Sequence, residues 1–243
     1  MKKSILLCAA LLALCSACSN DEDEKTNEGN TNVKRTLTAC PNSNHPHAVD
    51  LGLPSGTKWA CCNVDASSPE GYGKYFAWGE AEEKEEYNMS SYQHKDDAGK
   101  YVNIGSDIAG TAYDVAQVRM GEDWQMPSHE QQIELIKYCT RYWITHNGIK
   151  GTLVIGPNGN QIFLPAAGYR QGMAVEGEGD FANYWSSTID PKSESSACNL
   201  FANSSYWFWS YYYGARYFGL PVRAVVKEAA QPTEPTEPTE PTE

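Results

Sequence analysis

Histidine and acidic clusters are the first candidates for chemistry in this chain. His45 and His47 flank a proline in the stretch HPH, a spacing that can supply two imidazole nitrogens to a metal ion. No acid or cysteine accompanies them in a metal-binding motif, so the sequence favours a solvated turn. The stretch EGEGD at 176–180 offers the carboxylate oxygens that Ca²⁺ prefers, but without the spacing of an EF-hand. We therefore predict no metal site and no cofactor.

The sequence carries none of the motifs of the common nucleophilic and nucleotide-dependent enzymes. Gly-x-Ser-x-Gly, the P-loop and the dinucleotide fingerprint are all absent. These motifs place a nucleophile or cradle a phosphate, so their absence removes the corresponding reaction classes. The sequence predicts a protein that is not an enzyme, and an enzyme of unrecognised type remains the alternative.

The most unusual stretch of the chain is SYWFWSYYYGARYFG at 205–219. It holds nine aromatic side chains in fifteen positions, whereas aromatic residues make up 12% of the whole chain. Tyr and Trp combine a large apolar body with a polar tip and lose little entropy on binding, so they suit contact with sugars and proteins. Packing in the core would also use some of these rings. The sequence therefore predicts an aromatic contact surface here, backed by core aromatics.

Strand periodicity divides this stretch into core and surface residues. A strand over 206–211 alternates its side chains between two faces, and a half-buried sheet needs only one apolar face. We assign Trp207, Trp209 and Phe218 to packing. A guanidinium among aromatic rings can stack or clamp a carboxylate. The predicted ligand-binding residues are Tyr206, Tyr211, Tyr213, Arg216 and Tyr217.

The formal net charge of −12 limits the choice of partners. A nucleic-acid groove needs clustered Lys and Arg to neutralise phosphates, so nucleic acid is excluded as a partner. The composition leaves a glycan or protein ligand.

The N-terminus has the features of a processed leader. Lys2 and Lys3 precede an apolar run too short to span a bilayer, and LCSAC follows it. LCSAC resembles the lipobox of bacterial lipoproteins, which implies a signal peptide at 1–17 and a lipid on Cys18. The acidic run SNDEDE resembles the surface-export signal of lipoproteins in the Bacteroides group. We therefore expect an outer-membrane protein, anchored only by lipid and facing the cell exterior.

Composition divides the remaining chain into a tether, one globular block and a tail. Residues 18–36 are polar and acidic, so they cannot offset the entropy of ordering and are predicted to be disordered. Residues 228–243 contain four Pro-Thr-Glu repeats, typical of an extended polyproline II tail. The globular domain is predicted at 37–227.

The domain sequence indicates short strands and two helices. VDLGLPSGTKWACCNV alternates around a Pro-Ser-Gly turn, and Asn158-Gly159 predicts a β-hairpin. Ser128 and Gln131 form a capping box at the start of one helix, whose predicted buried face is Ile133, Leu135, Ile136 and Cys139. A weaker helix fits TAYDVAQV, with Thr111 as its N-cap and Asp114 in its first turn.

The order of five motifs resembles a known family. YFAWGE at 75–80, WQMPS at 124–128, IFLPAAGYR at 162–170, YWSS at 184–187 and GLPVR at 219–223 together resemble the Fibrobacter succinogenes major paralogous domain. The resemblance implies a C-type lectin-like fold, also shared by formylglycine-generating enzymes: an α+β domain with two helices, a twisted antiparallel sheet and long loops. It also implies a structural role for Arg223 in the closing Val-Arg pair.

The resemblance carries expectations about cysteines and about the ligand-facing side. Cys62 and Cys139 match positions where the family often has cysteine, which implies a disulfide between them and leaves Cys40, Cys61 and Cys198 unassigned. Formylglycine-generating enzymes need two late cysteines, and only Cys198 is late, so that activity does not carry over. The last third of the C-type lectin-like fold faces the ligand, and the aromatic stretch falls there.

Three function classes remain on this basis. The first is a surface lipoprotein binding module, an adhesin that contacts a glycan or protein through the aromatic C-terminal surface. The second is a structural or tip subunit of a pilus or fimbrial assembly, in which the same aromatic residues form a subunit interface. The third is the enzyme of unrecognised type.

Overall fold

The computed structural model describes residues 37–38, 40, 43–210 and 214–227, without the side chain of Trp209. The described residues belong to one compact unit, Arg35–Glu243. The predicted leader, tether and tail lie outside the described residues. The same holds for Cys18 and for two of the predicted ligand-binding residues, Tyr211 and Tyr213.

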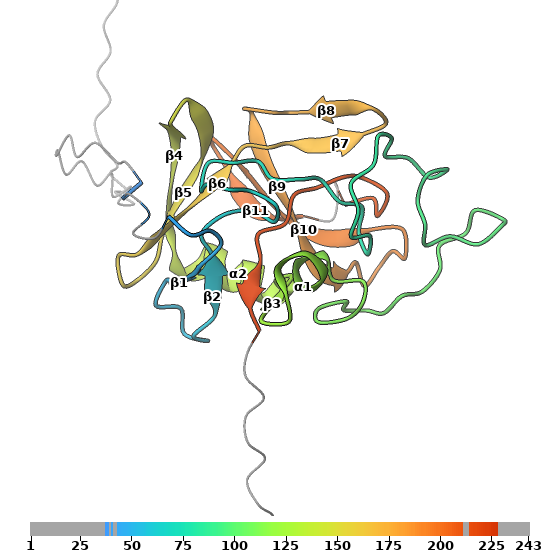
Figure 1. Cartoon of the computed structure of the whole chain (residues 1–243), viewed down its shortest axis with the longest axis horizontal. Helices are drawn as coiled ribbons and strands as arrows, with labels where there is room; N and C mark the ends of the chain where they lie inside the picture. The colour runs from blue at the N-terminus through green and yellow to red at the C-terminus, as the bar shows by residue number, and fades with distance from the viewer. Residues whose placement is uncertain (1–36, 39, 41–42, 211–213, 228–243) are drawn as a thin grey trace, which may run out of the picture. The chain divides into compact units, whose positions relative to one another are not determined.

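The described residues form an α+β fold that consists mostly of antiparallel sheets, with two helices (Figure 1). The sheets have the strand orders β1-β2-β12-β3, β4-β5-β6, β7-β8 and β11-β10-β9, and every pair of named strands is antiparallel. The elements are β1 Ala48–Asp50, β2 Lys58–Ala60, α1 Val115–Met120, β3 Trp124–Gln125, α2 His129–Tyr138, β4 Thr140–His146, β5 Ile149–Ile155, β6 Gln161–Pro165, β7 Tyr169–Gln171, β8 Ala174–Glu176, β9 Phe181–Ile189, β10 Ala197–Asn203, β11 Trp207–Ser210 and β12 Val225–Val226.

Tight turns set the register of two hairpins in the β4-β5-β6 sheet. Asn158-Gly159 lies in the β5–β6 turn, and the Gly159 amide donates to the Gly156 carbonyl at 2.9 Å, which confirms the predicted hairpin. Asn147 and Gly148 join β4 to β5, and both have the positive φ that a type I′ turn requires.

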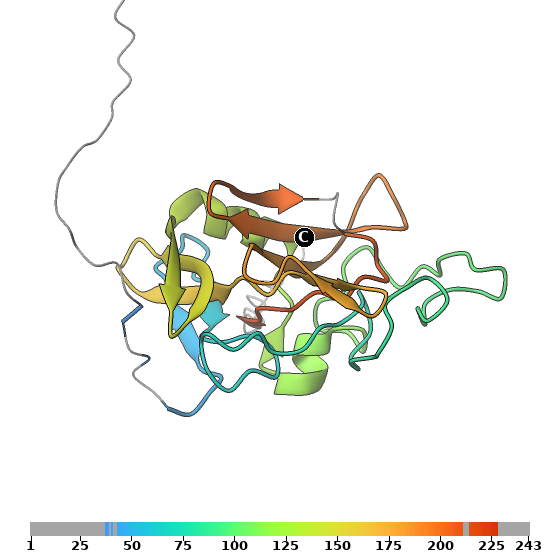
Figure 2. The ribbon, with the colours of Figure 1, turned by 90° about the horizontal axis from the view of Figure 1, so that it is seen from above.

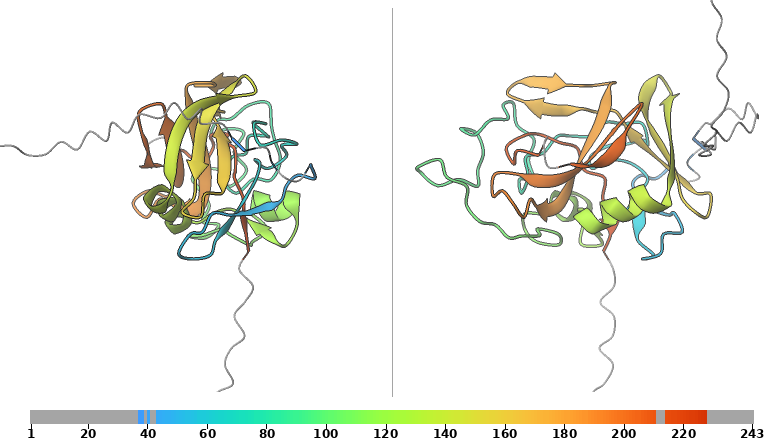
Figure 3. Two further views of the ribbon diagram at one scale, coloured as in Figure 1. Left: turned by 90° about the vertical axis from the view of Figure 1, so that its left-hand side faces the viewer. Right: turned by 180° about the vertical axis from the view of Figure 1, so that it is seen from behind.

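The capping box of α2 is confirmed. The Ser128 hydroxyl accepts from the Gln131 amide, and the Gln131 side chain accepts from the Ser128 amide. Of the predicted buried face, Leu135 is buried, whereas Ile133, Ile136 and Cys139 are only half-buried. Gln132 is also buried, and its side-chain amide donates to the Tyr184 and Trp185 carbonyls. The helix packs along the β9-β10-β11 sheet, as the right-hand view in Figure 3 shows.

The N-cap of α1 differs from the predicted one. Asp114, not Thr111, is the N-cap, and its carboxylate accepts from the Ala116 and Gln117 amides. The same carboxylate also accepts from the Gly110 and Met126 amides, so it joins the helix to the segment that leads into α2. Burial raises the pKa of the Asp114 carboxyl, although these hydrogen bonds oppose the shift.

The two ends of the domain meet in one sheet. Val225 of β12 pairs with Trp59 of β2 on one side and with Gln125 of β3 on the other. Between β2 and α1, residues 61–114 form a long segment with isolated bridges only. Trp78 anchors this segment, because it is fully buried and its indole N–H donates to the Ser186 carbonyl of β9.

Candidate functional site

The β10–β11 hairpin packs one face against a core cluster and carries aromatic rings on its other, outer face. Figure 2 shows β10 and β11 running side by side. Trp207 is opposite Ala202 and packs against the core cluster that contains Ala202 and Leu135 of α2. Phe208 is opposite Phe201, and both point to the other side of the sheet because strand side chains alternate.

Six aromatic rings continue from this outer side of the sheet across to β7 and the C-terminal loop. Neighbouring ring centroids are 5.3, 5.2, 6.0, 5.1 and 5.0 Å apart, within the range of favourable aromatic pairs. We call this set the aromatic ladder; in order, its members are Phe208, Phe201, Phe181, Tyr169, Phe218 and Tyr217.

The β10–β11 hairpin exposes aromatic side chains at one end of the ladder. Tyr206 is 65% exposed and Phe208 is 42% exposed, whereas Phe201 is buried. The Asn203 side chain accepts from the Ser205 and Tyr206 amides, and the Asn203 amide donates to the Tyr206 carbonyl. Arg141 donates to the Asn203 carbonyl at 2.7 Å. Tyr206 therefore projects from a turn whose backbone is well fixed.

Three further aromatic assignments can be compared with the structure. Trp207 and Phe218 are half-buried and pack against the core, which confirms their predicted packing role. Tyr217, predicted to be exposed, is half-buried against a cluster that includes Tyr87. It lines a cavity of about 420 Å³ together with Gln171 and Glu176. Tyr217 can therefore present only part of its ring to a ligand.

Arg216 was predicted to bind a ligand, and the structure contradicts this. The side chain is 1% exposed, and its guanidinium donates to the Tyr92 hydroxyl and to the Glu194 and Val102 carbonyls. Its central carbon lies 4.9 Å from the Trp78 ring centroid, with the rings of Tyr92 and Tyr101 only slightly farther away. Arg216 is a structural residue that joins the long segment to the C-terminal loop.

Arg223 is structural, as predicted. It is 1% exposed and donates to Asn63 Oδ1 and to the carbonyls of Ala60, Cys61 and Phe163.

The implied bridge between Cys62 and Cys139 is not formed, and both thiols are free in the structure. Cys62 donates to the Ala66 carbonyl, whereas Cys139 ends α2 and packs against the cluster around Leu135. The two cysteines thus have separate environments. Burial raises the pKa of the Cys139 thiol to about 11.

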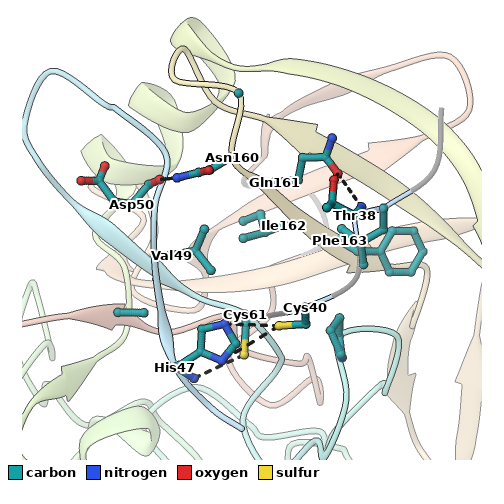
Figure 4. Close-up of a pocket in the computed structure, with 14 residues that line it drawn as sticks. Thr38, Cys40, His47, Val49, Asp50, Cys61, Asn160, Gln161, Ile162 and Phe163 are labelled. Atoms are coloured by element: carbon teal, nitrogen blue, oxygen red, sulfur yellow. Dashed lines mark hydrogen bonds between the residues drawn. The ribbon is translucent and has the colours of Figure 1, made fainter. Parts of the chain in front are cut away.

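A second feature, which the sequence analysis missed, is a cavity of about 330 Å³ between β1 and β6 (Figure 4). Val49, Ile162 and Phe163 form its apolar part. Thr38 donates to Gln161 Oε1 through both its amide and its hydroxyl, so the start of the domain lies along β6.

The HPH stretch borders this cavity and is not the solvated turn that we predicted. Both imidazoles are partly buried, with His45 Nδ1 3.2 Å from Cys61 Sγ and His47 Nε2 3.2 Å from Cys40 Sγ. The neighbouring Cys62 thiol, the His47 amide and the His45 ring all lower the pKa of the Cys61 thiol, whereas burial opposes them. The EGEGD carboxylates, by contrast, are exposed to solvent.

Comparison with known proteins gives no match to a protein-family model, a curated protein or a solved structure. Neither helix in the described part of the chain is long and apolar enough to cross a membrane.

Proposed function

We propose that the chain is a surface lipoprotein binding module, an adhesin that contacts a glycan or protein through the exposed end of the aromatic ladder. In this proposal the chain belongs to the Fibrobacter succinogenes major paralogous family and has its C-type lectin-like fold. A lipid on Cys18 holds it at the outer membrane, with the domain facing the exterior.

The observation that carries the proposal is the exposure of Tyr206 and Phe208 on a fixed hairpin. Large aromatic side chains in a soluble domain are normally buried, and those held rigidly at a surface are the usual energetic centres of binding sites. The rings behind Phe208 hold it in place, so binding orders few additional side chains. A sugar ring or an apolar protein side chain can stack on such a surface without rearranging the fold.

The positions of the family motifs support the fold assignment. Phe76 and Trp78 from YFAWGE, Trp185 from YWSS and Leu220 from GLPVR are all buried in one core cluster. WQMPS supplies β3 and the N-cap of α2. Residues that build the core are those a fold family must retain, and the two helices with antiparallel sheets agree with the fold that the resemblance implies.

The carboxyl groups favour binding over catalysis. A catalytic acid or base usually has a shifted pKa and faces a cleft. Asp114, whose pKa is raised, is occupied by four backbone amides. The pKa of Glu70 is lowered, mainly by a hydrogen bond from Asn147. Both carboxyl groups therefore have structural roles.

A glycan array followed by titration of the best glycan tests the proposal. Phe208→Ala and Tyr206→Ala should each weaken binding, by about 1 to 3 kcal/mol at the better position. Tyr113→Ala is the matched control, because Tyr113 is also exposed and packs on His94, which is not part of the ladder. If Phe208→Ala and Tyr206→Ala bind the glycan as tightly as Tyr113→Ala does, the aromatic surface is not the binding site.

The structural or tip subunit remains a second candidate because, among the strands that the structure describes, β11 lies at the edge of its sheet. Edge strands carry unpaired backbone groups that can pair with another chain. Sedimentation of the purified chain over a range of concentrations separates the two proposals. Assembly that Phe208→Ala abolishes would support the subunit, whereas a monomer that binds a glycan supports the adhesin.

A further inference from the structure

Two cysteines and two histidines meet beside the β1–β6 cavity; Figure 4 shows three of them, Cys40, His47 and Cys61. The four residues are Cys40, His45, His47 and Cys61, and one ligand atom from each lies within 4.8 Å of all the others. Cys61 is buried and the other three are partly buried. The cluster is separate from the aromatic ladder and plays no part in the function proposed above.

The β1–β2 hairpin explains how this cluster forms. Ala48 is opposite Ala60, and one step further the Cys61 amide donates to the His47 carbonyl at 2.9 Å. This register places Cys61 beside His47. His45 lies two residues earlier, and its ring stacks on that of His47 with centroids 5.6 Å apart. Cys40 approaches from the segment that Thr38 fastens to β6.

The distances are close to those of a tetrahedral site. With Zn–S near 2.3 Å and Zn–N about 2.0 to 2.1 Å, neighbouring ligand atoms of a tetrahedron are about 3.3 to 3.8 Å apart. Two of the sulfur–nitrogen pairs in the cluster, Cys61 with His45 and Cys40 with His47, are each 3.2 Å apart, and every other pair of ligand atoms lies within 4.8 Å. Two pairs therefore already lie near the tetrahedral spacing, and the four ligand atoms are close enough together to surround one ion.

We propose that Cys40, His45, His47 and Cys61 form a Cys₂His₂ site for a zinc ion. Two thiolates and two imidazoles are a ligand set typical of structural zinc, and two thiolates balance the charge of the ion. Calcium and magnesium require oxygen ligands, which the cluster lacks.

The expected role of the ion is to hold the start of the domain in place. Four protein ligands fill a tetrahedron and leave no open position for a substrate. The His47 amide donates to Cys61 Sγ at 3.3 Å, an outer hydrogen bond of the kind that orients a metal ligand. Zinc would connect the segment at Cys40 to the β1–β2 hairpin, through His45 and His47 before β1 and Cys61 after β2.

The same proximity permits a different bond. Two cysteine sulfurs this close can form a disulfide in an oxidising compartment, and such a bond would consume both thiolates. A disulfide between Cys40 and Cys61 would not require imidazole nitrogens beside the two sulfurs. Because His45 and His47 do lie beside them, the geometry favours the metal. The test must distinguish these two states directly.

The experiment titrates the reduced, metal-free full chain with Zn²⁺ and, in parallel, with Co²⁺. We expect one ion per chain, a visible spectrum of tetrahedral Co²⁺ with thiolate charge transfer, and a higher melting temperature with zinc. Cys40→Ser and His45→Ala should each lower zinc affinity by about tenfold or more, because even loss of an outer partner has an effect of that size. Both residues are only partly buried, so these variants should fold, as circular dichroism can verify.

Matched controls keep the result specific. Cys139→Ser and His146→Ala change a partly buried thiol and a partly buried imidazole outside the cluster, and both should bind zinc like the wild type. The proposal is overturned if the reduced chain binds no zinc, or if Cys40→Ser binds zinc as tightly as Cys139→Ser. It is also overturned if peptide mapping of protein isolated without reductant finds Cys40 bonded to Cys61.

Discussion

Replacing Arg216 distinguishes a structural arginine from a ligand-binding one. Its guanidinium makes three hydrogen bonds, at 2.9, 3.1 and 3.1 Å, and lies among three aromatic rings. In Arg216→Ala, the Tyr92 hydroxyl and the Glu194 and Val102 carbonyls lose their donor. The variant also loses a cation–π contact, which contributes about 2 kcal/mol in a desolvated site. Water entry and loop relaxation recover part of the lost stability, so we expect a net decrease of about 3 to 5 kcal/mol in the free energy of unfolding.

Thermal unfolding followed by circular dichroism measures this loss. For a domain of this size the melting temperature should fall by roughly 6 to 20 °C. Arg119→Ala is the control, because Arg119 pairs with Asp65 at the surface and should contribute about 0 to 1 kcal/mol. If Arg216→Ala melts like the wild type and yet loses ligand binding, the structural assignment of Arg216 is wrong.

Two further predictions concern the α1 cap and the anchor. Asp114→Ala should destabilise the domain by about 2 to 4 kcal/mol, because it removes an N-cap and leaves buried amides without an acceptor. Because burial raises the pKa of Asp114, the folded state binds this proton more tightly than the unfolded chain does. The difference in unfolding free energy between wild type and Asp114→Asn should therefore widen as pH falls toward about 4, the usual range of a carboxyl group, and narrow toward neutral pH. Chemical denaturation at several pH values measures this difference, and a constant value would contradict the prediction. Cys18→Ala, outside the described residues, should leave the leader uncleaved or release the protein from the membrane fraction, and unchanged fractionation would argue against lipidation.

Local signals in the sequence predicted local structure. Asn158-Gly159 and the Ser128–Gln131 capping box act over a few residues, so both could be identified before any tertiary information. Asn147-Gly148 is the same local turn signal, and both residues have the positive φ that it predicts. Thr111 and Asp114 both suit an N-cap, and the choice depended on Met126, whose amide also binds the Asp114 carboxylate. That contact has no local signature.

The surroundings of Arg216 and of the Cys–His cluster depend more strongly on contacts between residues distant in the sequence. The partners of Arg216 come from residues 92, 102 and 194, which no spacing rule connects. The pairing of His47 with Cys61 could have been reached by extending the hairpin register outward from the Pro-Ser-Gly turn. The approach of Cys40 could not, because it depends on the contact between Thr38 and Gln161 of β6.

The most direct test of the central claim is to measure glycan affinity and melting temperature together for the Phe208→Ala chain. We expect weaker binding by about 1 to 3 kcal/mol with a melting temperature close to that of the wild type, because Phe208 is 42% exposed at the end of the ladder. Unchanged affinity, or a loss of affinity that only follows unfolding, would contradict an aromatic binding surface.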